Sequence, residues 1–481
     1  MKQLNKQLFL FVDIRRIWIG IFLFTTASAL MFQLVILPYF APGLHAGNGL
    51  VAGGDYVGFH RLAATLAEKI TQQGWGAWEL RTKQQAPAGI AAAVYVFIGP
   101  HPWALIPLNA AVHATAAALI VRLVQPFVPN IRYAALCVLP FVLFPSSLTW
   151  YAQIHKDGLF FLGLCLCLYA WVLLSRAETW SARCTQAFLS IAYVFLGCFF
   201  IWVMRPYGIK LVQGIGLIFA LVLVPSFVFR AWRGQLQPLK ALLAILVILA
   251  LPFAVGVFKD GAANGEVTIA TNEMFEPLSA EEEQRGGLVA SRGSFASKAQ
   301  NVVAAVQWKK TQWLPDALDN VFLTLSIVRY GYAGSIGGSN VDTDVVFDNA
   351  LSFFPYLPRA IQLGFMAPFP ASWFEQGTVN SSGVLRKVSV AEMLLVYGAL
   401  LFLPYILWRG RKKMEIWLIF CFCIIFILLY TYITPNIGSL YRSRHGFLLL
   451  LAAFGIAGVI SFRRRSQGII SPSMWQPNNY S

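Results

Sequence analysis

Long apolar runs separated by short polar segments dominate this chain. An apolar run of about 20 residues is long enough to cross roughly 30 Å of hydrocarbon as an α-helix, so each such run predicts a membrane span. Ten spans are expected, near residues 17–40, 102–124, 131–151, 157–176, 184–204, 208–230, 238–258, 388–408, 414–433 and 440–462. The pattern therefore predicts an all-α polytopic membrane protein with about ten transmembrane helices.

Two long polar segments interrupt this series and divide the chain. We expect an N-terminal transmembrane module at 1–258 with a first outer loop at 41–101, a large outer loop at 259–387, and C-terminal helices with a short basic tail at 388–481. Both outer loops should carry interfacial helices. The expected ones are an amphipathic helix from Tyr56 to Gln72 with Asp55 at its N-cap, a short apolar helix at 86–99, and a surface helix from Phe295 to Trp313.

Composition and charge support a membrane location and orient the chain. Of the 481 residues, 58% are hydrophobic and only 12% are charged, which is too apolar for one soluble core of this length. The net charge of +16 does not predict a nucleic-acid partner, because the basic residues lie in short clusters between apolar runs. With the N-terminus inside, every inward connector carries basic residues, as the positive-inside rule requires. We expect a multi-pass protein of the bacterial inner membrane with both termini cytoplasmic.

Polar residues at the outward ends of the helices form the most informative pattern. They come from separate connectors that face the same side, so they are able to converge, and their cations oppose the orientation bias seen elsewhere. Binding an anion is the simplest reason for such cations. The candidate catalytic residues are Asp55 and Asp157, and the candidate substrate-binding residues are His60, Arg61, His155, Lys156, Arg205, Tyr207, Tyr441, Arg442, Arg444 and His445.

These residue types fit sugar transfer from a polyprenyl phosphate. The leaving phosphate gains negative charge as the glycosidic bond breaks, and preorganised Arg or Lys side chains would stabilise that change. A carboxylate at a helix N-terminus stays ionised and can take the acceptor's proton, which favours Asp55 as the base and Asp157 as the second choice. Simpler structural roles remain open: Asp55 as a helix cap, Lys156 and Asp157 as an ion pair, and Arg205 as a residue that snorkels to headgroups.

The N-terminal part also resembles a known group. Asp55 early in the first outer loop, a helix ending at Phe97-Ile98-Gly99, Pro145 high on the third span and Asp157 opening the fourth resemble the GT-C membrane glycosyltransferases over roughly residues 1–210. The likeness is strongest to protein mannosyltransferases and lipid A aminoarabinose transferases. It implies an inverting transferase with a catalytic acid at Asp55 and a second acid at Asp157. Where the family often has two adjacent acids, this chain has Asp55 followed by Tyr56.

The connector before the last span adds to the resemblance. Asn436-Ile437-Gly438 followed by Tyr441-Arg442-Ser443-Arg444 looks like the basic motif that such transferases place there to hold a lipid phosphate. The partners implied are a polyprenyl-phosphate-linked sugar donor, a glycan, lipid or protein acceptor, and membrane lipids. No cofactor or metal site is expected, because no histidines are paired at i,i+4 spacing; a divalent cation would be needed only for a diphosphate donor.

Two other classes of function compete with this interpretation. A polysaccharide polymerase or O-antigen ligase also uses lipid-linked donors, outward Arg and His residues and a large outer loop. A flippase or transporter of lipid-linked sugars would have ionisable groups near mid-bilayer, whereas the middles of the predicted spans are almost free of them, with Glu392 and Lys210 close to span ends. The sequence therefore favours chemistry at the outer surface.

Overall fold

The computed structural model describes residues 2–175, 184–235, 238–258, 306–333, 339–370, 373 and 380–466. All secondary-structure elements in these ranges are helices. The long ones are α1 (Lys2–Met31), α4 (Ile106–Val124), α8 (Asp157–Ser175), α9 (Cys184–Met204), α10 (Gly208–Trp232), α11 (Pro238–Ala254), α16 (Asn380–Leu400), α18 (Met414–Ile433) and α19 (Ile437–Ser466). The short helix α17 (Leu403–Arg409) continues α16 after a two-residue break.

Seven helical stretches among the described residues are long and apolar enough to cross a membrane: Asp13–Phe40, Pro102–Phe127, Asp157–Ser175, Gly208–Trp232, Arg386–Arg409, Met414–Ile433 and Ile437–Arg465. The predicted all-α membrane protein is therefore confirmed. Shorter apolar helices occur at Phe188–Met204 and Ala244–Val257, where two further spans are expected. The total of ten spans stays a prediction.

The third expected span, 131–151, is divided into α5 (Ile131–Cys137), α6 (Leu139–Leu143) and α7 (Pro145–Tyr151). Pro140 and Pro145 lie at the two breaks. A proline lacks the N–H group that continues the helical hydrogen-bond series, and its ring disfavours the helical conformation at the residue before it. Phe144 accordingly has extended backbone. The break lets α7 direct its side chains independently of α5.

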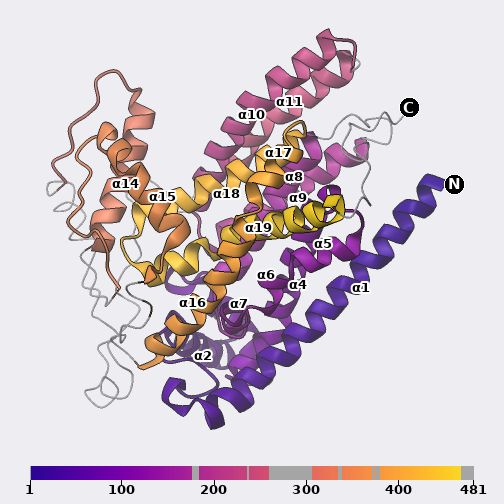
Figure 1. Ribbon diagram of the computed structural model, residues 1–481. Coiled ribbons are helices and arrows are strands. Elements are labelled where there is room, and N and C mark those ends of the chain that lie inside the picture. The colour runs from indigo at the N-terminus through magenta and orange to yellow at the C-terminus, as the bar shows by residue number, and fades with distance from the viewer. Residues whose placement is uncertain are drawn as a thin grey trace.

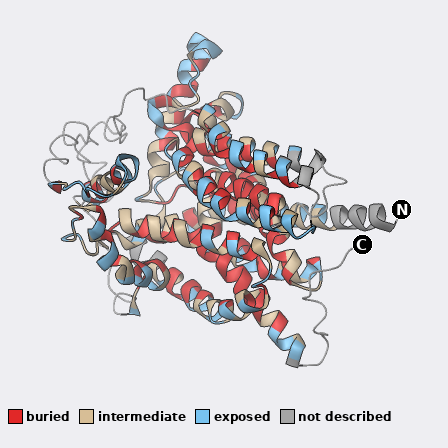
Figure 2. Ribbon diagram, turned by 90° about the horizontal axis from the view of Figure 1, so that it is seen from above, coloured by how far each residue is buried: buried red, intermediate tan, exposed pale blue. Residues whose placement is uncertain are grey.

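A continuous cluster of buried apolar residues runs from α4 to α19 and joins the helices. Glycines allow close helix crossings: a Cβ atom added to Gly455 of α19 would lie 2.1 Å from the carbonyl oxygen of Ala399 in α16, and one added to Gly163 of α8 would lie 2.6 Å from the carbonyl oxygen of Gly197 in α9. Figure 2 shows the buried residues along the middle of the helix bundle and the exposed ones on its outer faces. Many of those exposed residues are large and apolar, such as Leu221 and Phe253, as expected for surfaces in contact with lipid.

The segment expected to be the first outer loop folds into two packed helices, α2 (Asp55–Gln73) and α3 (Ala86–Ile98). Phe59, Ala63 and Ile70 of α2 pack against Ala88 and Tyr95 of α3 in a small apolar core. The amphipathic helix expected at 56–72 is present, but Gly54 is its N-cap and Asp55 is its first helical residue. The Asp55 carboxylate thus stays at the positive end of the helix without capping it.

The described part of the large outer loop contains α14 (Asp316–Ala333) and α15 (Phe353–Met366). The surface helix expected from Phe295 to Trp313 begins outside the described residues, and the chain from 307 to 315 is not helical. There the Asp319 carboxylate accepts hydrogen bonds from Trp308 Nε1 at 2.9 Å and from the Thr311 backbone N–H at 3.1 Å. These bonds fix an irregular segment ahead of α14.

The segment that contains α14 and α15, which we name the α14–α15 segment, is attached to the connector between α18 and α19. Arg329 of α14, only 1% exposed, donates to the carbonyl oxygens of Val345 and Tyr432, each at 3.1 Å. Asn436 Nδ2 donates to Asn340 Oδ1 at 2.7 Å, and Ile437 N donates to the Ser339 carbonyl at 2.9 Å. In Figure 1, α2, α14 and α15 lie toward the left and bottom, whereas the first turn of α1 and the end of α19 lie toward the right.

Candidate functional site

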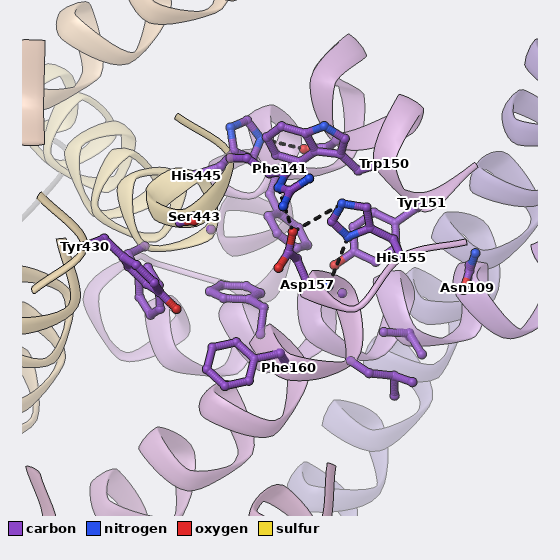
Figure 3. A pocket seen from close by; sticks show the side chains of 18 residues that line it. Asn109, Phe141, Trp150, Tyr151, His155, Asp157, Phe160, Tyr430, Ser443 and His445 are labelled. Carbon is purple, nitrogen blue, oxygen red and sulfur yellow. Dashed lines mark hydrogen bonds and ion pairs between the residues drawn. The ribbon is translucent and has the colours of Figure 1, made fainter. Parts of the chain in front are cut away.

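A cavity of about 60 Å³ lies between α7, α8, α18 and α19. Its walls are mainly aromatic, and its polar groups are gathered near the starts of α8 and α19, as Figure 3 shows. The lining residues that matter here are Ser147, Trp150, Tyr151, His155, Asp157, Phe160, Tyr430, Arg442 and His445. Four of the sequence-predicted residues, His155, Asp157, Arg442 and His445, therefore line one cavity.

Asp157 is the centre of the polar cluster. It is the first residue of α8, and its carboxylate contacts the guanidinium of Arg205 through Oδ1. Its other oxygen, Oδ2, lies 3.2 Å from Arg442 Nε and 3.2 Å from His155 Nε2. The Asp157 side chain is 20% exposed. A carboxylate this enclosed is retained in the charged form by its cationic neighbours.

His155 is held as a neutral ring. Its Nδ1 accepts a hydrogen bond from the Asp157 backbone N–H at 3.0 Å, so the proton of the imidazole is on Nε2, which faces the Asp157 carboxylate. Burial lowers the pKa of His155 well below its ordinary value, although the nearby Asp157 carboxylate opposes this effect. His155 thus orients Asp157 and adds no charge to the site at neutral pH.

Arg442, near the start of α19, joins the two candidate catalytic acids. Its Nη2 lies 3.2 Å from Asp55 Oδ2, and its Nε lies 3.2 Å from Asp157 Oδ2. Within the described structure Arg442 Nε and Asp157 Oδ2 are buried and lack a hydrogen-bond partner, because their mutual geometry is unsuitable. Asp55, Arg442, Asp157 and Arg205 therefore form one chain of alternating charges, which we name the ion-pair chain.

Arg205 ends the ion-pair chain. It lies in the connector between α9 and α10, donates to the Tyr207 hydroxyl at 3.0 Å, and its guanidinium lies 5.2 Å from the ring centre of Phe160. Burial is the largest single effect and lowers the pKa of Arg205, but the Asp157 carboxylate and the nearby tyrosines together outweigh it and raise this pKa well above its ordinary value. Tyr207, in contrast, has 49% of its surface exposed.

Lys156 provides a third cation beside the ion-pair chain. Its Nζ donates to Gln85 Oε1 at 2.9 Å and lies 5.2 Å from the ring centre of Phe59, so it faces the first outer loop. Burial lowers the pKa of Lys156 to about 8, and the neighbouring Arg205 acts in the same direction. Lys156, Arg205 and Arg442 together face two carboxylates, which leaves one positive charge in excess. Such an excess in a partly buried site favours an anionic ligand.

Two predicted residues of the first loop lie away from the ion-pair chain. His60 packs inside the loop, where its Nδ1 lies 2.9 Å from the Tyr95 hydroxyl and its Nε2 lies 3.3 Å from Asn48 Nδ2. Burial lowers its pKa, which suits a neutral core histidine. Arg61 is exposed on the surface of α2. The structure does not bring either residue to the cavity.

Tyr441, Arg444 and His445 are also on α19, and only His445 shares the cavity face of Arg442. Arg444 is fully buried, and its guanidinium donates to the carbonyl oxygens of Leu363 and Ala367 at the end of α15. His445 lines the cavity, with Nε2 2.9 Å from Ser147 Oγ. The Tyr441 hydroxyl donates to Glu392 Oε2 at 2.5 Å. The outward arginines thus separate into Arg442, which faces the acids, and Arg444, which fastens α15.

The sequence missed several residues of this site. Trp150 and Tyr151 form much of the cavity wall, and their only signal was their place at the outward end of a span, just before His155. Gln85 and Glu392 carried no local signal that linked them to the site. Among the described residues, no three His, Cys, Asp or Glu side chains are grouped closely enough to hold a metal ion. Comparison with protein-family models, with curated proteins and with solved structures finds no match to this chain.

Proposed function

We propose that the protein is a membrane glycosyltransferase of the GT-C kind, which moves a sugar from a polyprenyl-phosphate donor to an acceptor at the outer face of a bacterial inner membrane. The observation that supports this most is the position of Arg442 between Asp55 and Asp157. Glycosyl transfer needs a cation for the leaving phosphate and a carboxylate for the acceptor within reach of each other. The ion-pair chain supplies both.

The proposal assigns a role to each member of the ion-pair chain. Asp55 is the base, because it lies at a helix N-terminus and its side chain is 45% exposed, which leaves it accessible to an acceptor hydroxyl. Arg442 holds the donor phosphate, with Lys156 and Arg205 adjacent. Asp157 is more enclosed and has three charged or polar neighbours, so its role is to orient Arg442 and Arg205. Arg444 has no part in this scheme, because its guanidinium is engaged by carbonyl groups of α15.

The size of the cavity implies that the donor opens the site. About 60 Å³ is room for a few water molecules and is too small for a sugar ring. The Arg442–Asp55 contact lies beside this cavity, and a donor phosphate would compete with Asp55 for the same guanidinium. Donor binding would thus free Asp55 to act on the acceptor. This order prevents activation of an acceptor before a donor is present.

The arrangement of the helices agrees with an outward-facing site. The basic residues Arg409 and Arg463 to Arg465 lie at the last turns of α17 and α19. The ion-pair chain lies near the opposite ends, at the first residues of α2 and α8, in the connector before α10 and in the second turn of α19. Under the positive-inside rule the basic ends are cytoplasmic, with both termini, and the ion-pair chain faces the periplasm. A lipid donor would then reach it from the outer leaflet.

The test is transfer of radiolabelled sugar by the purified protein in nanodiscs, with a panel of undecaprenyl-phosphate sugars and an acceptor mixture from bacterial envelopes. Transfer from one of these donors supports the proposal. Turnover only with diphosphate-linked glycans would instead indicate a polymerase or O-antigen ligase. Movement of the donor between leaflets without sugar transfer would indicate a flippase.

A further inference from the structure

A buried carboxylate with no role in the proposed chemistry lies on α16. Glu392 is only 3% exposed, and it stands in the stretch Arg386–Arg409, which is apolar enough to cross a membrane. Placing a carboxylate inside such a segment is unfavourable unless it meets specific partners. Its contacts therefore indicate what it is for.

Both oxygens of Glu392 are engaged, and each one holds a different helix. Oε1 accepts a hydrogen bond from the Ser146 backbone N–H of α7 at 2.8 Å, and Oε2 accepts one from the Tyr441 hydroxyl of α19 at 2.5 Å. Ser146 and Tyr441 are far apart in the sequence. One side chain of α16 thus fixes the relative position of α7 and α19.

These two helices form adjoining walls of the cavity. α7 contributes Ser147, Trp150 and Tyr151, while α19 contributes Arg442, directly after Tyr441, and His445. The walls also meet each other: Ser147 Oγ lies 2.9 Å from His445 Nε2, and the rings of Trp150 and His445 are 4.5 Å apart in an edge-to-face arrangement. A change at Glu392 would therefore alter where Arg442 stands relative to the aromatic wall.

Glu392 does not line the cavity, so it does not touch a bound donor. We propose that Glu392 is a positioning residue, which acts through Tyr441 to aim Arg442 at the donor phosphate. This inference rests on the proposed function, because the position of Arg442 affects function only if Arg442 binds the phosphate of a donor. It assigns the C-terminal helices a part in donor recognition.

The test is binding of radiolabelled undecaprenyl phosphate to the full-length protein in nanodiscs. Glu392→Gln keeps the size of the side chain and removes its charge, and Tyr441→Phe removes one of its two hydrogen bonds. Each substitution should weaken binding about tenfold, the size expected from losing one charge-assisted hydrogen bond. In an Arg442→Ala background, Glu392→Gln should have no further effect, because the group that it aims is absent.

Asp319→Asn is the matched control. Like Glu392, Asp319 is buried, with 4% of its surface exposed, and accepts one hydrogen bond from a side chain and one from a backbone N–H. Unlike Glu392, it lies on α14, away from the helices that line the cavity. It should lower thermal stability as Glu392→Gln does and leave the affinity for undecaprenyl phosphate unchanged. If Glu392 is purely structural, Glu392→Gln will lower stability and leave the affinity unchanged, as Asp319→Asn does, or it will weaken binding by the same factor with and without Arg442→Ala. Either result overturns the inference while the proposed function stands. If the unmodified protein binds no undecaprenyl phosphate, both proposals fail.

Discussion

Arg442 and Asp55 are 387 residues apart in the sequence, and their Nη2 and Oδ2 atoms lie 3.2 Å apart in the fold. The first outer loop and the last helix thereby meet at one point, beside Asp157. The Arg442 guanidinium already contacts two carboxylates, so a donor phosphate must compete with them for its N–H groups. We expect this competition to control the activity of the site.

The first prediction concerns Arg442. Arg442→Ala should weaken binding of a polyprenyl-phosphate sugar by about tenfold to a hundredfold, because a hydrogen bond between charged groups contributes about 1.5–3 kcal/mol. Thermal stability should fall less than in Asp157→Asn, since the Arg442 side chain is 30% exposed and Asp157 keeps its contact with Arg205 when Arg442 is removed. Equal donor affinity in a correctly folded Arg442→Ala protein would contradict the assignment.

Arg444, two residues further along α19, should behave in the opposite way. It is fully buried and bonded to the end of α15, so Arg444→Met leaves two buried carbonyl oxygens without partners and should lower stability by about 2–4 kcal/mol. The fraction that folds should bind donor with normal affinity. Thermal unfolding in detergent, read beside donor affinity, separates the two arginines, and a selective loss of affinity in Arg444→Met would show that Arg444 belongs to the site.

Asp157 and Asp55 should also differ. Asp157 contacts Arg205, Arg442 and His155 and is 20% exposed, so Asp157→Asn should destabilise the protein by about 3 kcal/mol, as when one partner of a buried pair is removed. Asp55→Asn should cost about 1 kcal/mol at most, because the Asp55 side chain is 45% exposed. Chemical or thermal unfolding of both variants checks the order, and a larger loss for Asp55→Asn would contradict it.

Lys156 gives the site a pH dependence. Its pKa is lowered to about 8, so its ammonium is charged below that pH and becomes neutral as the pH rises through it. The affinity for a phosphodiester-linked sugar, which has no proton of its own to lose in this range, should fall between pH 7 and 9. Lys156→Arg keeps the charge and should flatten the profile. An unchanged profile in Lys156→Arg would assign the titration to another group.

The chain's hydrophobic pattern predicted the fold class well, because an apolar run of fixed length has few alternatives to a membrane helix. The seven long helical stretches correspond to seven of the expected spans. The division of 131–151 at Pro140 and Pro145 was not foreseen, although both prolines are visible in the sequence. Hydropathy alone does not register the loss of helical hydrogen bonds at proline.

The candidate site was predicted in part. Cations expected at the outward ends of the helices led to the candidate residues, and the structure brings five of these candidates together: Asp55, His155, Asp157, Arg205 and Arg442. Their roles stay a prediction. The sequence did not separate Arg442 from Arg444, since the face of a helix that meets a carboxylate depends on where distant helices pack. His60 likewise had the right residue type but bonds within its own loop. Glu392 stood out only as an ionisable group close to a span end, because its partners lie on the distant helices α7 and α19.

The most direct measurement compares sugar transfer by the unmodified protein, Asp55→Asn and Glu68→Gln, with a labelled undecaprenyl-phosphate sugar in nanodiscs. Glu68 is an exposed acid on the same helix, so it controls for loss of a carboxylate from α2. The account predicts transfer that falls at least about a hundredfold in Asp55→Asn, the usual range for a lost general base, with donor binding retained and Glu68→Gln fully active. An Asp55→Asn protein that folds and transfers sugar at the unmodified rate would contradict it.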